Sequence, residues 1–241
     1  MKISVDVVSD VVCPWCYVGK RRIEAAIRKL DGAHEVQLTW RPFELNPDLP
    51  REGAERTAYR VRKFGSLERS RELEGQMRRV GEGEGIAFTS NPPATIPNTL
   101  DAHRLLAFAL ARGMQDVLCE TLFRAYFVDG ADIGSPDELA RIAGRAGLDA
   151  AEVAVYLGTT EGTAEVRKEE AHYRALDISG VPFFIVDGKY ALSGAQPPEA
   201  FLEVFRRVIE DRSAAATPPA ATSPSTKATD GACRVDNPDA C

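Results

Sequence analysis

The sequence lacks any hydrophobic run long enough to cross a bilayer, which takes about 20 consecutive apolar residues. It also lacks the apolar segment and small-residue cleavage site of a secretory signal, because its first residues already form a strand-like run. These two absences argue against membrane insertion and secretion, and they predict a cytoplasmic protein.

Basic residues are too few to outweigh the acidic ones. The chain has 30 Lys and Arg against 36 Asp and Glu, which gives a net charge of −6. A negative chain is repelled by phosphate groups, so we expect neither nucleic acid nor a membrane among its partners. Histidine is scarce as well, with 3 residues, which argues against a His-rich metal site. We expect no metal and no cofactor.

Cysteine is also sparse, with 5 residues in 241. A chain of this length with 44% hydrophobic residues buries a full-sized core without disulfide staples. Because cytoplasmic thiols are kept reduced, a close cysteine pair there indicates catalysis rather than cross-linking. Cys13 and Cys16 form such a pair, whereas Cys119 lies in an apolar helical stretch and is predicted to be a buried, inert thiol.

The pair Cys13 and Cys16 lies where a predicted strand, residues 2–8, passes into a predicted helix, residues 14–30. Pro14 suits the first helical turn, which places Cys13 at the N-cap. The free N–H groups and the dipole of the helix start should lower the pKa of Cys13. Cys16, one turn later and half-buried, is then the resolving thiol. Trp15 is expected at the rim, beside an exposed Cys13.

The same C-x-x-C spacing also occurs as half of a zinc site. No second close pair follows within the usual spacing. A Cys₄ zinc site from Cys13, Cys16, Cys233 and Cys241 therefore remains as one alternative.

The order of predicted elements divides the chain into a split α/β domain and an insert. Residues 1–50 have a β-α-β pattern, and residues 177–211 have a β-β-α pattern with a hairpin turn at Asp187-Gly188. Residues 51–176 between them are predicted to form a large inserted all-helical domain. Its charged run, residues 69–79, is expected to form a solvated helix face.

The composition changes after the last predicted helix. Residues 212–241 are rich in Ala, Pro, Ser and Thr and have no large apolar side chains before Cys233, so we predict a disordered, flexible tail. Cys233 and Cys241 near its end are a candidate second redox pair that reaches the first one. An accidental pair of exposed thiols is the alternative.

Together these features resemble the thioredoxin-fold disulfide oxidoreductases of the DsbA family, and within it the FrnE-like group. The resemblance extends from residue 1 to about residue 211 and implies a thioredoxin fold, in which the β-α-β and β-β-α halves share one sheet. It further implies that the peptide bond before Pro182 is cis and faces the C-x-x-C. The Val181 backbone would then be aimed at the sulfur, so that a substrate chain adds as an extra strand. The stretches that carry the resemblance are residues 10–19, 98–104, 180–184 and 193–197.

The resemblance implies a thiol–disulfide oxidoreductase or isomerase that acts on protein or peptide disulfides. Cys13 would attack and Cys16 would resolve, with a thioredoxin- or glutathione-type electron donor. Related secretory oxidants carry histidine where Trp15 stands, so we expect a less depressed Cys13 pKa here. Asp10 is expected to form a turn or to relay protons to Cys16. Pro14, Trp15, Val181 and Pro182 complete the predicted site.

A second resemblance provides the main alternative function. Glutathione-dependent isomerases and transferases of the kappa type, such as 2-hydroxychromene-2-carboxylate isomerase, resemble this architecture. They use a serine near the Cys13 position, which the two cysteines of this sequence argue against. His103 lies on a predicted helix that the resemblance places at the cleft, and a structural hydrogen bond is its expected role.

Overall fold

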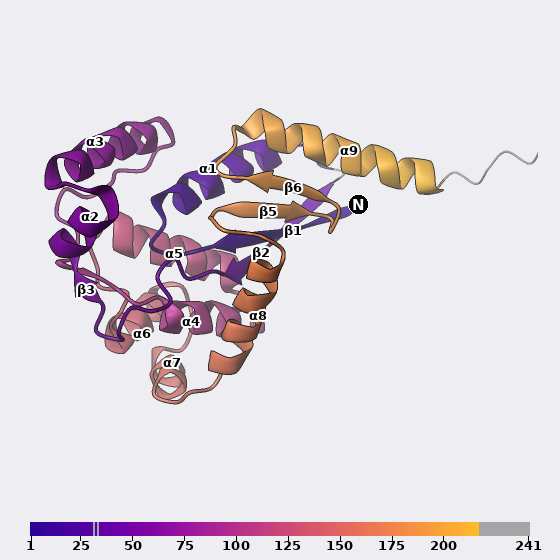
Figure 1. The fold of residues 1–241 in the computed structure, drawn as a ribbon. Helices are drawn as coiled ribbons and strands as arrows, with labels where there is room; N and C mark the ends of the chain where they lie inside the picture. Colours follow the sequence, from indigo (N-terminus) through magenta and orange to yellow (C-terminus); the bar gives the residue numbers. More distant parts are fainter. Residues whose placement is uncertain (31, 33, 217–241) are drawn as a thin grey trace, which may run out of the picture.

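A four-stranded mixed sheet lies at the centre of the computed structural model, which describes residues 1–30, 32 and 34–216 (Figure 1). The strand order is β2-β1-β5-β6; β1 is parallel to β2, while β5 is antiparallel to both β1 and β6. Asp187 and Gly188 both have positive φ, 57° and 64°, as a tight hairpin turn between β5 and β6 requires. The strands are β1 (Lys2–Ser9), β2 (Glu35–Pro42), β5 (Phe183–Val186) and β6 (Tyr190–Ser193).

Two helices cover one face of this sheet (Figure 1). Helix α1 (Pro14–Arg28) makes the crossover between the parallel strands, and α9 (Pro198–Ala216) packs beside it. The Phe184 ring of β5 meets the Phe201 ring of α9 edge to face, with centroids 4.8 Å apart. Helix α9 continues to Ala216, so the boundary predicted at residue 212 falls inside this helix. Alanine is a strong helix former, but the Pro, Ser and Thr that follow it in the sequence hid this preference in the composition, and Arg212 anchors this part of α9 on Asp187.

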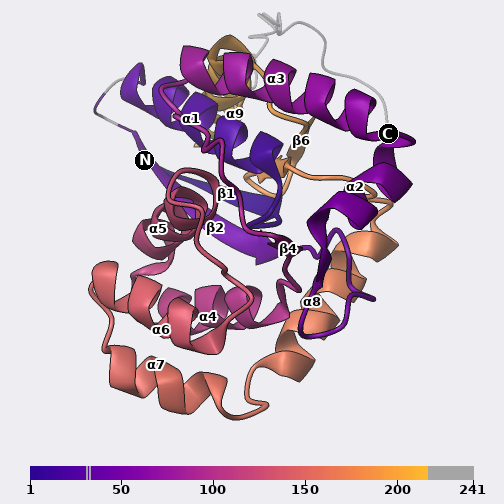
Figure 2. The ribbon, with the colours of Figure 1, turned by 90° about the vertical axis from the view of Figure 1, so that its left-hand side faces the viewer.

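The opposite face carries most of the insert (Figures 1 and 2). Helices α4, α5 and α8 contact β2, and α6 and α7 pack outside them. Strand β2 is an edge of the sheet, and Gln115 of α5 bonds the Trp40 N–H and C=O, both at 2.9 Å. A side-chain amide thus takes the place of a fifth strand. These helices are α4 (Leu100–Leu110), α5 (Gln115–Phe127), α6 (Pro136–Arg145), α7 (Ala150–Leu157) and α8 (Thr163–Ala175).

The remaining two helices form an arm at one end of the sheet (Figure 1). They are α2 (Arg56–Phe64) and α3 (Leu67–Gly83), and we refer to this pair as the arm. Gly65, with φ of 88°, ends α2, and the Ser66 hydroxyl accepts the Arg69 N–H to start α3. Arg22 of α1 forms an ion pair with Glu84 at 2.6 Å, which ties the end of the arm to the body.

The insert was predicted to be all-helical, but it also contains two short strands. Strand β3 (Ala54–Glu55) pairs antiparallel with β4 (Thr95–Ile96) at the base of the arm. Strands of two residues are too short to show the alternation that reveals a strand in a sequence. One buried hydrophobic cluster includes residues of the sheet, of α1 and of the insert, such as Val7, Val18 and Leu122. Among the described residues, no helix has the length and apolar character needed to span a membrane.

Candidate active site

The Cys13–Cys16 turn connects β1 to α1 as the sequence predicts. The Cys13 N–H donates to the Asp10 carbonyl at 3.0 Å, and Cys13 is the N-cap residue of α1, with Pro14 in the first turn. Both cysteines are free thiols. Cys13 is only 5% exposed and Cys16 is fully buried, so neither has the exposure expected from the sequence. Trp15 between them is 45% exposed and forms the rim.

The two thiols differ in acidity. The Cys16 thiol donates a hydrogen bond to Cys13 and, with the backbone N–H groups of Cys16 and Trp15, lowers the pKa of Cys13 against burial and the Asp10 charge. Burial, followed by that same hydrogen bond, raises the pKa of Cys16 well above its ordinary value. The direction predicted for Cys13 is confirmed, although its largest cause is the neighbouring thiol rather than the helix start. Cys119 is buried, and burial raises its pKa well above the ordinary value.

The Val181–Pro182 peptide bond is cis, as the resemblance implies. The Cys13 thiol donates to the Val181 carbonyl, with Sγ and O 3.5 Å apart. Gly19 lets α1 approach this segment, because a Cβ there would lie 3.1 Å from both the Pro182 and Phe184 side chains. The structure therefore brings Cys13, Cys16, Trp15, Val181 and Pro182 together.

Asp10 belongs to a group of buried charges beneath this turn. Its carboxylate is fully buried and accepts the backbone N–H groups of Leu45 at 2.7 Å and Val12 at 3.4 Å. His103 of α4 is 3% exposed, and its Nε2 lies 3.5 Å from Asp10 Oδ1, long for a hydrogen bond. Burial opposes the charged imidazole, yet Asp10, with Glu44 and Glu170 behind it, raises the pKa of His103.

Glu44 and Glu170 extend this group away from the cysteines. Glu44 is fully buried, and its backbone N–H donates to the Glu170 carboxylate at 2.5 Å. Arg167 of α8 forms ion pairs with Glu44 at 2.5 Å and Glu170 at 3.0 Å. Burial, followed by the Glu170 charge, raises the pKa of Glu44 to about 7. We call these five residues, Asp10, Glu44, His103, Arg167 and Glu170, the buried charge cluster.

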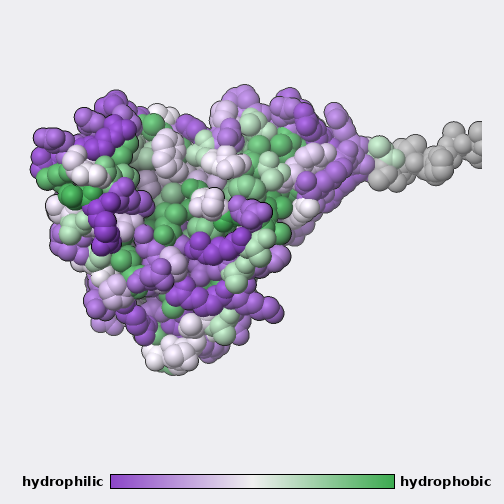
Figure 3. Space-filling model, in the orientation of Figure 1, coloured by the Kyte–Doolittle hydropathy of each residue, from purple (hydrophilic) through white to green (hydrophobic). Residues whose placement is uncertain are grey.

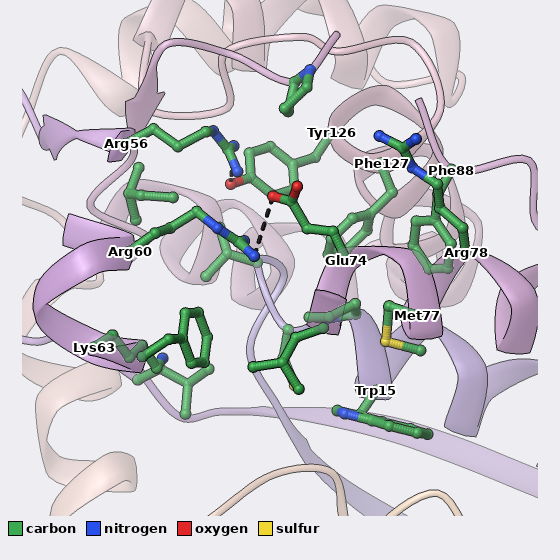
Figure 4. Close-up of a pocket in the computed structure, with 18 of the residues that line it drawn as sticks. Trp15, Arg56, Arg60, Lys63, Glu74, Met77, Arg78, Phe88, Tyr126 and Phe127 are labelled. Carbon is green, nitrogen blue, oxygen red and sulfur yellow. Dashed lines mark hydrogen bonds and ion pairs between the residues drawn. The ribbon is translucent and has the colours of Figure 1, made fainter. Parts of the chain in front are cut away.

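A cavity of about 510 Å³ opens between the active-site turn and the arm. Cys13, Pro14 and Trp15 line one part of it, and both arm helices line another. Hydrophobic side chains gather in the hollow between the arm and the body (Figure 3). Part of the charged run of α3 faces this cavity, with Glu74 and Arg78, so that run is not simply a solvated face (Figure 4). We call the cavity the arm pocket.

The described residues contain no group of three or more His, Cys, Asp or Glu side chains arranged to hold a metal ion. Cys233 and Cys241 lie outside the described residues. The predicted second redox pair and the Cys₄ zinc alternative both depend on them, and both stay predictions.

A family model for the DSBA-like thioredoxin domain matches residues 4–206. The chain belongs to this family. The uncharacterized protein YwbO of Bacillus subtilis is 28% identical to it over 212 residues, covering 88% of this chain and 98% of that protein. A crystal structure of a probable DsbA oxidoreductase from Streptomyces coelicolor is 32% identical, with a TM-score of 0.79, covering 98% of this chain and all of the other. The thioredoxin-like DSBA fold and a general thiol–disulfide oxidoreductase role follow from these relatives.

More distant structures share the fold alone. The cytosolic disulfide reductase DsbM of Pseudomonas aeruginosa, solved with GSH, is 16% identical, with a TM-score of 0.59 over 86% of this chain and 99% of DsbM. A 2-hydroxychromene-2-carboxylate isomerase is 14% identical, with a TM-score of 0.62 over 89% of this chain and all of that one. Proteins named for disulfide reduction and for 2-hydroxychromene-2-carboxylate isomerisation therefore both have this architecture.

The sequence did not reveal the buried charge cluster beyond Asp10 and His103. Glu44, Arg167 and Glu170 each look like ordinary surface charges, and 123 positions separate Arg167 from Glu44. The only local signal is that Glu44 follows Pro42 and Phe43 at the end of a strand. The arm pocket was missed as well, because its basic residues lie on helices that resemble solvated ones.

Proposed function

We propose that this protein reduces or isomerises disulfides of proteins or peptides, with Cys13 as the attacking thiolate and Cys16 as the resolving thiol. Cys13 attacks one sulfur of the substrate and forms a mixed disulfide, while the other substrate sulfur leaves as a thiolate and takes up a proton. Cys16 loses its proton and attacks Cys13, which releases the second substrate thiol. The substrate gains two electrons, and the protein is left with a Cys13–Cys16 disulfide.

One observation carries this proposal: a thiol of lowered pKa and a thiol of raised pKa lie one helical turn apart beside the Val181 carbonyl. The lowered pKa supplies the thiolate that attacks. The raised pKa keeps Cys16 protonated until the mixed disulfide has consumed the Cys13 charge, which is one of the causes of that raised pKa. The Val181 backbone and the cis Pro182 beside the sulfur support recognition of an extended substrate chain.

The direction of electron flow depends on the compartment. In a reducing cytoplasm, reduction and isomerisation are favoured over oxidation. Turnover then needs an electron donor of the thioredoxin or glutathione type to reduce the Cys13–Cys16 disulfide. Asp10, Pro14 and Trp15 are proposed to support the site rather than to react.

Reduction of insulin disulfides by the purified full chain, with a dithiol donor, tests the proposal. We expect Cys13→Ser to abolish turnover, and Cys16→Ser to accumulate mixed disulfides on Cys13 that mass spectrometry identifies. Cys119→Ala is the matched control, because Cys119 is buried and its raised pKa keeps it protonated. An inactive wild type, or a Cys13→Ser variant as active as wild type, would overturn the proposal.

The glutathione-dependent isomerase alternative has fold similarity in its favour. Cys13, in place of the serine expected there, weighs against it, as does the neighbouring thiol Cys16. Tight binding of glutathione without any thiol–disulfide exchange would favour this alternative instead.

The tail pair Cys233 and Cys241 is proposed to exchange disulfides with the first pair. A variant with both replaced by serine should slow multiple turnover while leaving the first stoichiometric round intact.

The division of the chain into a split domain of residues 1–50 and 177–211, an insert of residues 51–176 and a tail likewise stays a proposal.

A further inference from the structure

The arm pocket differs in charge from the chain around it. Four basic side chains line it, against the single carboxylate of Glu74, although the whole chain carries a net charge of −6. Arg56, Arg60 and Glu74 lie on one side of the cavity and Trp15 on the other (Figure 4). A ligand joined to Cys13 therefore extends from the thiol towards basic groups. The four basic residues are Arg56, Arg60, Lys63 and Arg78.

Among the described residues, most of this positive charge has no carboxylate partner. Arg56 donates to the Tyr126 hydroxyl at 2.9 Å and to the Pro93 carbonyl, and Lys63 donates to the Tyr59 hydroxyl at 2.9 Å. These acceptors are neutral. Within the described part of the chain, Arg78 has neither an ion-pair nor a hydrogen-bond partner.

Arg60 is the exception, with Glu74 at 3.1 Å and the Ser70 hydroxyl at 2.6 Å. Burial lowers the pKa of Arg60, Glu74 opposes that change, and the nearby Arg56 charge adds to it. Two guanidinium groups thus face one carboxylate in a partly enclosed cavity. An anion that enters the cavity relieves this repulsion and replaces water at donors that are already oriented.

The other walls of the pocket are apolar or aromatic. Phe88, Met77 and Phe127 line it along with the exposed ring of Trp15. A volume of about 510 Å³ is in the range of small-ligand sites, which is enough for a few residues of a peptide. The pocket therefore suits a short segment with apolar parts near the sulfur and negative charge farther along.

We propose that the arm pocket selects disulfides whose sulfur is flanked by carboxylates, by binding the acidic flank while Cys13 attacks the sulfur. This inference rests on the proposed function and specifies its substrates. Carboxylates on a small peptide thiol and on an acidic protein segment supply the same chemistry. The electron balance is that of the exchange described above, in which the substrate disulfide is the oxidant and the Cys13–Cys16 dithiol is the reductant.

The test is a single turnover of the reduced full chain with three disulfide-linked peptides of equal length. The residues on both sides of cysteine are Asp in one, Asn in the second and Lys in the third. Reactions are stopped with acid, and the Cys13–Cys16 disulfide is quantified by alkylation and mass spectrometry. At low salt we expect the Asp peptide to react roughly tenfold faster than the Asn peptide and the Lys peptide to be slowest. Salt should reduce the difference, because it screens the charges.

The variant that tests the pocket is Arg56→Gln combined with Lys63→Gln, since neither residue pairs with a carboxylate in the part of the chain that the structure describes. The matched control is Lys189→Gln combined with Arg207→Gln, which removes two exposed basic residues away from the pocket. We expect the pocket variant to lose the preference for Asp, so that it reacts with the Asp and Asn peptides at similar rates. The control variant should keep the preference. Far-ultraviolet circular dichroism checks that the pocket variant is folded.

Equal rates for all three peptides in wild type would overturn the inference, as would a preference that survives in the pocket variant. If the proposed function itself were wrong, none of the peptides would oxidise the Cys13–Cys16 pair, so the two failures are distinguishable. Glutathione disulfide identifies the source of the carboxylates. If the pocket variant reacts with glutathione disulfide more slowly than wild type does, small peptide thiols are substrates of the pocket. If the two rates are equal, the substrates are acidic protein segments. Both results uphold the inference.

Discussion

The buried charge cluster and the arm pocket both adjoin the Cys13–Cys16 turn, yet they hold charge in opposite ways. In the cluster, three buried carboxylates face a buried histidine and the half-exposed Arg167, and the ion pairs are internal. In the arm pocket, four basic residues line an open cavity, and two of them, Arg56 and Lys63, are held by neutral oxygens. Charges satisfied internally affect the stability and acidity of the protein itself, whereas charges left without counter-ions act on what enters from outside.

Removal of Arg167 should give the largest change in stability, because it leaves two buried carboxylates without their cation. Because the Arg167 side chain is 39% exposed, solvent screens part of this loss, and we expect Arg167→Leu to lower the free energy of unfolding by about 2.5 kcal/mol at about pH 8. Urea unfolding measures this value. Arg207→Leu is the control, since it breaks an exposed pair with Glu203 and should cost less than about 0.5 kcal/mol. If the two variants lowered the free energy of unfolding equally, the cation of the buried charge cluster would contribute no more to stability than an exposed one.

Neutralising Glu44 should raise the free energy of unfolding, which is the opposite of the effect expected for Arg167→Leu. Its pKa rises from 4.5 to about 7 on folding, so the stability it contributes is complete below about pH 4.5 and is lost as the pH rises through 7. Glu44→Gln imitates the protonated acid. We expect it to raise the free energy of unfolding by about 2 kcal/mol at about pH 8, with a much smaller gain near pH 5. An equal gain at both values would show that the Glu44 charge is not the cause.

The buried charge cluster also affects the acidity of Cys13, through Asp10. Asp10 raises the pKa of Cys13, so Asp10→Asn, which keeps the acceptor for the Leu45 N–H, should lower that pKa further. The ultraviolet absorbance of the thiolate, followed against pH, reports the change. Asp6→Asn is the control, because Asp6 lies on β1, just before Asp10, but is paired with Arg41, and this variant should leave the titration unchanged. If the pKa of Cys13 were the same in Asp10→Asn and in wild type, the charge of Asp10 would not affect the acidity of Cys13.

The pocket cations should have the smallest effect on stability. Lys63 is exposed and donates to the Tyr59 phenol, so Lys63→Gln should change the free energy of unfolding by less than about 0.5 kcal/mol. Thermal unfolding is a sufficient measurement. A loss comparable to that of Arg167→Leu would mean that the pocket is structural and would narrow the difference between the two regions.

Local signals made much of the fold predictable. The strand before Cys13, the hairpin at Asp187-Gly188 and the caps at Ser66, Ser135 and Asp149 all depend on neighbouring residues, and the structure has each of them. The family resemblance, rather than any local signal, implied the cis bond before Pro182 and the place of Val181 beside Cys13, and the structure has both.

Features that depend on distant partners could not be predicted in this way. Strand β3 exists only because β4, about 40 positions later, pairs with it. Glu44 and Glu170 lie 126 positions apart, and neither shows in the sequence that it will be buried. The basic residues of α2 have the pattern of a solvated helix, and only the fold shows that several of them face the thiol.

The arm is one uninterrupted piece of chain, from Arg56 to Gly83, joined to the body through the β3–β4 pair and the Arg22–Glu84 contact. The groups around the thiol come instead from positions as far apart as 10, 103 and 181. Specificity and chemistry are therefore encoded in different ways along the gene. Because the four basic residues of the arm pocket all lie on the arm, we expect exchange of this one segment between relatives to change the substrate preference proposed above without moving the redox centre.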